Sequence, residues 1–170
     1  PPPARMRATQ LLAGLARPRV AALVAGTIAL AFILLVAKGE DAAAHLYQTQ
    51  VWRDHGWRFW DNNWYAGRYS QINYSLLYYP LAAVLGTWTV VTASVAGSAA
   101  AFAHIVRRRW PQHWMWPSVA FTVLAPLPTL TGTYPFMFGL ALALATIAAL
   151  QSQRWVLAGA LGIAVALGHL

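Results

Sequence analysis

Long apolar stretches recur through this chain, and they constrain its fold more than any other feature. A bilayer's hydrocarbon core of roughly 30 Å is crossed by a helix of about 20 apolar residues. Charged residues make up 9% of the chain and hydrophobic residues 59%, whereas a soluble domain has about 25% charged residues. These values argue against a water-soluble fold. We expect an all-α integral membrane protein, a polytopic bundle of helices.

The apolar and polar stretches divide the chain into successive segments. We expect a basic tail (1–19), a first span (20–38), a polar loop (39–80) and further spans at 81–106, 114–128, 135–151 and 155–170. Pro126, Pro128 and Pro135 interrupt the apolar stretch that follows Trp110, so we expect two spans there. The chain begins with Pro1 and ends inside an apolar run. We therefore expect that it is incomplete.

The basic residues cluster between the expected spans, in 5–19, in 107–109 and at Arg154. Short cytoplasmic loops retain arginine and lysine, so this placement predicts a cytoplasmic N-terminus and places 39–80 on the outer side. The formal charge of +8 thus indicates membrane topology rather than nucleic-acid binding. Membrane lipids are the expected surroundings, and nucleic acid is not an expected partner.

All four acidic residues lie in this outer loop, and Glu40 and Asp41 begin it. Asp41 and His45 have the i, i+4 spacing of one helix face, and we expect the loop to be helical there. Such a pair can act as a general base or contribute to a metal site. Alternatively, Asp41 caps the helix through its side-chain oxygen.

A divalent metal ion is the one cofactor that the loop suggests. His55, beside Asp54, could join Asp41 and His45 as ligands, or it could end the loop helix in solvent. The chain contains no cysteine, so a thiolate site is excluded.

Aromatic residues are concentrated in the same loop. Tryptophan and tyrosine often anchor a protein at the membrane interface, and this explains Tyr78 and Tyr79. It does not explain the polar residues interleaved in the stretch Asp61-Asn62-Asn63-Trp64-Tyr65-Ala66-Gly67-Arg68-Tyr69. Flat apolar faces beside hydrogen-bonding groups and a cation suit a sugar or a phosphate-bearing headgroup.

The loop resembles the first outer loop of GT-C type membrane glycosyltransferases. The resemblance rests on Gly39-Glu40-Asp41-Ala42-Ala43-Ala44-His45-Leu46-Tyr47, Trp57-Arg58-Phe59-Trp60, Trp64-Tyr65-Ala66-Gly67 and Tyr78-Tyr79-Pro80-Leu81. More narrowly, it is similar to the bacterial multi-spanning membrane proteins named as 6-pyruvoyl-tetrahydropterin synthase-related. Many GT-C members pair their acids as Asp-Asp or Asp-Glu, whereas this chain has Glu40-Asp41.

The resemblance implies a GT-C-like fold in a bacterial cell membrane and transfer of a sugar from a polyprenyl-phosphate carrier to an acceptor on the outer face. It implies Asp41 as the catalytic base, with Glu40 as its neighbour. Either Arg58 or Arg68 would neutralise the departing phosphate. The remaining substrate-binding candidates are His45, Trp60, Trp64 and Tyr65.

Two other classes of function remain open. A transporter for a lipid-linked substrate would place ionisable residues or broken helices at mid-membrane. The expected spans contain no charge in their interior, which argues against this class. A non-catalytic subunit would use the loop's tryptophans to dock other membrane subunits.

Overall fold

The computed structural model describes residues 4–36, 38–58, 60–62, 71–72 and 75–169. Most of these residues are helical, as expected. The helices are α1 (Ala4–Leu15), α2 (Pro18–Leu35), α3 (Glu40–His55), α4 (Tyr78–Leu85), α5 (Thr87–Arg109), α6 (Met115–Leu124), α7 (Pro128–Thr131), α8 (Tyr134–Gln151) and α9 (Trp155–Gly168). Two short strands, β1 (Trp60–Asp61) and β2 (Gln71–Ile72), pair antiparallel between α3 and α4.

Within the described residues, three helices, α2, α5 and α8, are long and apolar enough to cross a membrane. The expectation of a helical membrane protein is confirmed to this extent. The apolar helix α9 is shorter, at 14 residues. In α6 the helical run is 10 residues, about 15 Å at 1.5 Å per residue, which is half of a hydrocarbon core.

Gly86 divides the apolar stretch that follows Pro80 into two helices. Its φ of 88° lies in the region that favours glycine, and it ends α4 and precedes α5. The long helix therefore begins at Thr87, and the residues before it form a separate turn-and-helix unit. Tyr78 and Tyr79, at the start of α4, are fully buried in the core rather than placed at its surface.

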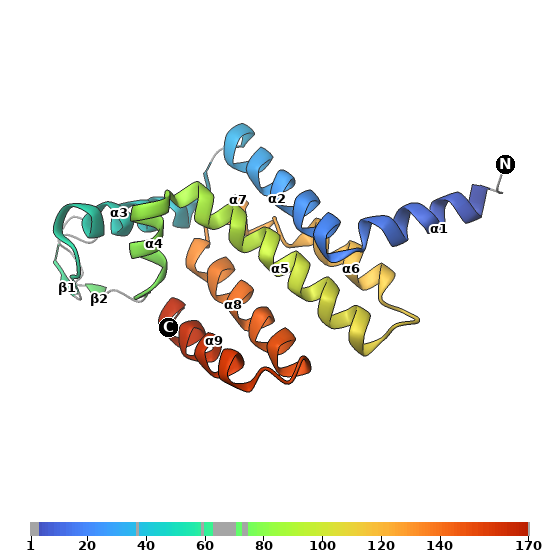
Figure 1. Ribbon diagram of the computed structural model, residues 1–170. Helices are drawn as coiled ribbons and strands as arrows, with labels where there is room; N and C mark the ends of the chain where they lie inside the picture. The colour runs from blue at the N-terminus through green and yellow to red at the C-terminus, as the bar shows by residue number, and fades with distance from the viewer. Residues whose placement is uncertain (1–3, 37, 59, 63–70, 73–74, 170) are drawn as a thin grey trace.

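The long helices pack side by side, with α5 between α2 and α8 and with α9 against α8 (Figure 1). Small residues permit the close approach of α2 and α5, since a Cβ added at Gly26 would lie 3.3 Å from the Cβ of Ala96. Alanine and valine side chains fill the core between them, among them Ala21, Ala25, Val91 and Val95.

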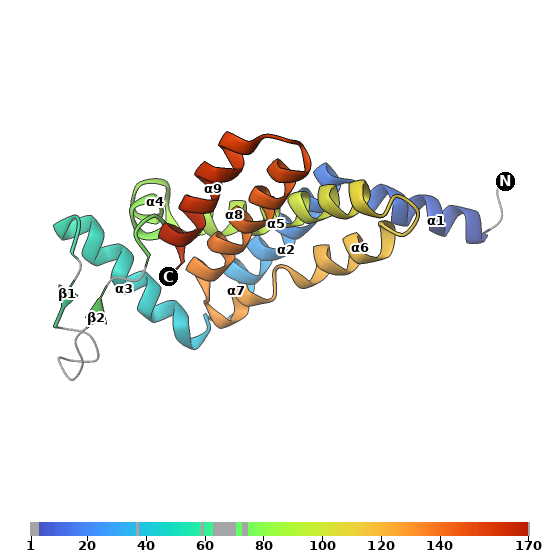
Figure 2. The ribbon, with the colours of Figure 1, turned by 90° about the horizontal axis from the view of Figure 1, so that it is seen from below.

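The bundle has two ends of different construction (Figures 1 and 2). At one lie α3, α4 and the hairpin, which we call the α3 end. At the other, the start of α2, the end of α5 and the α8–α9 turn come together and α1 projects outward; we call this the arginine end. The terminus of α9 returns to the α3 end, where the Ser75 hydroxyl donates to the Gly168 carbonyl at 2.6 Å.

Candidate functional site

The two candidate catalytic carboxylates occupy the first turn of α3, shortly after the end of α2, a helix long and apolar enough to cross a membrane. Both Glu40 and Asp41 are exposed. The N-cap is Gly39, and it makes no side-chain capping bond. The alternative reading of Asp41 as the cap is therefore wrong, because this residue lies inside the helix. Carboxylates in a first turn are instead favoured by the helix dipole.

The start of α3 is held tightly against the turn between α7 and α8. Gly132 has a φ of 87°, and a Cβ on it would lie 2.8 Å from the Cα of Ala42. A Cβ on Gly39 would likewise overlap the backbone carbonyl of Leu130. Only glycine fits at either contact, so the position of the carboxylates is fixed by backbone packing.

His45 lies one turn after Asp41, but inside the protein, with 5% of its surface exposed. Its Nδ1 lies 3.0 Å from the hydroxyl of Tyr79, and its ring centroid is 5.9 Å from that of Tyr134. Burial lowers the His45 pKa to about 4; the Asp41 charge opposes this shift and His169 adds to it. At neutral pH the imidazole is therefore uncharged, and the exposed carboxylate of Asp41 is backed by a neutral histidine.

Lys38 precedes the acidic pair in the sequence, and it was not among the predicted site residues. Lys38, the one lysine in the sequence, places its ammonium 5.3 Å from the ring centroid of Trp88. The Trp88 ring in turn meets Tyr134 edge-on, with centroids 5.7 Å apart. Sequence reasoning assigned Lys38 to the end of the first span; its position two residues before Glu40 was the available signal.

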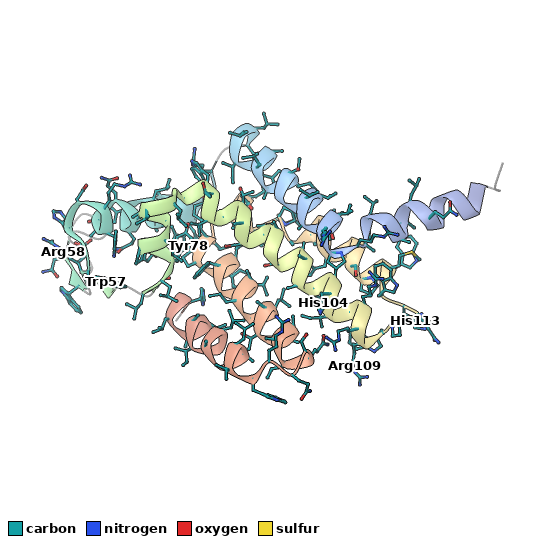
Figure 3. All side chains as sticks on the ribbon, viewed as in Figure 1. Trp57, Arg58, Tyr78, His104, Arg109 and His113 are labelled. Atoms are coloured by element: carbon teal, nitrogen blue, oxygen red, sulfur yellow. The ribbon has the colours of Figure 1, made fainter. Side chains whose placement is uncertain are left out.

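The substrate-binding candidates Arg58 and Trp60 lie at the other end of α3. From Asp41 to His55 the helix advances about 21 Å at 1.5 Å per residue, and Arg58 comes after that point. Figure 3 shows Arg58 and Trp57 together at the tip of the molecule. The structure thus does not bring Arg58 to the acidic pair. Trp64, Tyr65 and Arg68 lie outside the described residues.

This distant tip is itself ordered by a hydrogen bond to α3. The Tyr47 hydroxyl donates to the Asp61 carboxylate at 2.7 Å, which raises the pKa of Tyr47. Trp57 and Trp60 remain half exposed, at 50% and 56%. The tip therefore presents two aromatic faces to its surroundings.

The proposed set of metal ligands does not come together. Asp41 and His55 are separated by the length of α3, about 21 Å, so these side chains cannot share one ion with His45. Within the part of the chain that the structure describes, no three histidine or acidic side chains are grouped as a metal site requires.

Comparisons with protein families, curated proteins and solved structures find no match for this chain.

Proposed function

We propose that this chain is a module of a membrane glycosyltransferase that takes a sugar from a polyprenyl-phosphate carrier, with Asp41 as the base. The observation that carries the proposal is the exposed carboxylate fixed in the first turn of α3, close behind a helix that can span a membrane. A lipid-linked donor exposes its sugar and phosphate at the membrane surface, where a carboxylate that follows a spanning helix would also lie. The resemblance of 39–81 to GT-C first outer loops supports the same assignment.

In the proposed reaction Asp41 accepts the proton of an acceptor hydroxyl as its oxygen bonds to the anomeric carbon. The bond from that carbon to the phosphate oxygen breaks, and the polyprenyl phosphate leaves with the electron pair. A positioned base typically contributes 10²- to 10⁴-fold in rate. Glu40, its exposed neighbour, could exchange roles with Asp41.

Lys38 replaces Arg58 as the proposed partner of the departing phosphate. The acceptor oxygen that Asp41 deprotonates and the departing phosphate oxygen are both joined to the same anomeric carbon in the transition state, so Asp41 and the cation that meets the phosphate must lie close together. Lys38 is three residues from Asp41, whereas Arg58 lies beyond the far end of α3. An ammonium beside a developing phosphate charge stabilises the transition state.

The test is sugar transfer by membranes that contain the protein, with a panel of polyprenyl-phosphate sugars as donors. Asp41→Asn should lower turnover at least about 100-fold, because it removes the base and retains the shape. Asp54→Asn is the matched control, since this exposed carboxylate lies at the far end of the helix, where it accepts hydrogen bonds from the Gln50 side chain. Full turnover by Asp41→Asn would remove Asp41 from the mechanism.

The second pair of variants separates the two cations. Lys38→Gln should weaken donor use, and Arg58→Gln should leave it nearly unchanged. If Arg58→Gln weakened donor use and Lys38→Gln did not, the donor phosphate would instead bind near Arg58, beyond the far end of α3.

A second candidate function is suggested by the exposed tryptophans at the tip. Trp57 and Trp60 fit a docking surface for another membrane subunit, because exposed tryptophans are frequent interface anchors. Loss of complex assembly with retained turnover after Trp57→Ala and Trp60→Ala would favour this docking role for the tip.

A further inference from the structure

A cavity of about 520 Å³ opens at the arginine end, between α2, α5, α8 and α9. Its walls are formed mostly by small apolar side chains, including Ala101 on α5 and Ala145 and Ala148 on α8. Leu157 and Leu161 of α9 form another wall. A Cβ at Gly97, which also lines it, would meet no atom within 4 Å. The cavity is therefore a groove with an apolar interior.

Polar and cationic groups line one end of this groove. His104, Ser152 and Arg154 all border it, and the Arg108 guanidinium donates to the Ser152 hydroxyl at 2.9 Å. His104 lies seven residues from Gly97 on α5, about 10 Å along the helix. Figure 3 shows His104 at the end of α5 that carries Arg109, far from Arg58 and Trp57. The groove thus runs from a basic mouth into an apolar interior.

The three consecutive arginines divide between this mouth and nearby tryptophans. The guanidinium carbon of Arg107 lies 5.1 Å from the ring centroid of Trp114, and that of Arg109 lies 6.0 Å from the ring centroid of Trp110. Among the described residues, Arg108 is the one of the three that donates a hydrogen bond to a residue lining the groove. Arg108 is therefore oriented toward the groove, whereas Arg107 and Arg109 stack on tryptophan rings.

An anion at the mouth would meet no competing carboxylate, because all four acidic residues lie between 40 and 61, on the α3 end. A ligand that fits both the basic mouth and the apolar interior of the groove has a negative headgroup and an apolar chain. We propose that this groove binds an anionic phospholipid, with an acyl chain between α5, α8 and α9 and its phosphate on Arg154 and Arg108. Each cation near a lipid phosphate contributes about 1 kcal/mol, or roughly fivefold in affinity.

Native mass spectrometry of the protein in mild detergent tests the headgroup, with phosphatidylglycerol and phosphatidylcholine as the probes. Phosphatidylglycerol should be retained preferentially. Arg154→Gln and Arg108→Gln should each lower its retention about fivefold. Arg109→Gln is the matched control, since it removes the same charge one residue away and should change retention little. Equal retention of both lipids, or an equal loss in Arg109→Gln, would overturn the proposal.

The groove itself is tested by filling it. Gly97→Leu should reduce retention of both lipids, because the new side chain would occupy the open interior. Gly159→Leu on α9 is the control, since a Cβ added there also meets nothing within 4 Å and Gly159 does not line the groove. Should Gly97→Leu dissociate an oligomer and leave lipid retention unchanged, the groove would hold a second copy of the chain, and the lipid proposal would fail.

Discussion

The two ends of the bundle differ in charge and in how they are built. Residues 38–68 contain four basic side chains and all four acidic ones, so this segment is formally neutral. The net charge of +8 is therefore carried entirely by the rest of the chain, which has no acid. The α3 end therefore carries charges of both signs, including the carboxylates of the proposed reaction. The arginine end carries positive charge alone, which favours anions.

The two ends of the bundle also differ in the side chains that they bury. At the α3 end several polar side chains are buried, among them His45, Gln48, Thr49 and Ser75. The hydrogen bonds His45–Tyr79 and Ser75–Gly168 join these residues to α4 and to the end of α9. At the arginine end the helices meet through alanine and leave a groove. Specific contacts thus fix the geometry of the α3 end, whereas the arginine end leaves room for an amphiphile.

Gly132→Val should break the α3 end most severely. The residue has a φ of 87° and contacts the backbone of Ala42, so the new side chain meets both backbone strain and steric overlap. We expect a loss of about 3 kcal/mol in the free energy of unfolding. Thermal unfolding in detergent micelles measures it. Gly159→Val, in open space on α9, should have little effect; an equal loss in the two variants would contradict the tight contact.

The buried histidine should make stability depend on pH. Because the His45 pKa is lowered to about 4 in the folded protein, the unfolded chain binds more protons between pH 4 and 6.5. Its contribution is fully present above pH 6.5 and is lost as the pH falls toward 4, by at most about 1.4 kcal/mol per unit. Unfolding curves at several pH values should show a shallower slope for His45→Gln, and the wild-type slope for the exposed His55→Gln. An unchanged slope in His45→Gln would show that the imidazole is not buried uncharged.

A smaller effect is expected from Tyr79→Phe, which removes the hydroxyl that meets His45 Nδ1 at 3.0 Å. The loss should be about 1 kcal/mol, the usual net value of a buried hydrogen bond, in the same unfolding assay. A double-mutant cycle with His45→Gln measures the coupling between the two side chains. Additive losses would mean that the hydrogen bond does not form.

Hydropathy was sufficient to predict the helical membrane fold, because α2, α5 and α8 are long apolar segments whose signal is local. The arrangement at the α3 end was not predictable in this way. Tyr79 and Tyr134 lie 34 and 89 residues beyond His45, and no local pattern links them. The separation of Asp41 from Arg58 follows from one uninterrupted helix between them, whereas the sequence motif places both within a single loop.

The most direct test of this account is on which side of the membrane each end lies. The chain has no cysteine, so single cysteines can be introduced at Asn62, by the hairpin, and at Gln112, beyond the end of α5, without a background. Both positions are exposed. A membrane-impermeant maleimide should label Asn62→Cys in intact cells and Gln112→Cys only after permeabilisation. Labelling of both in intact cells, or in the reverse order, would contradict a carboxylate site on the outer face and a lipid groove on the inner one.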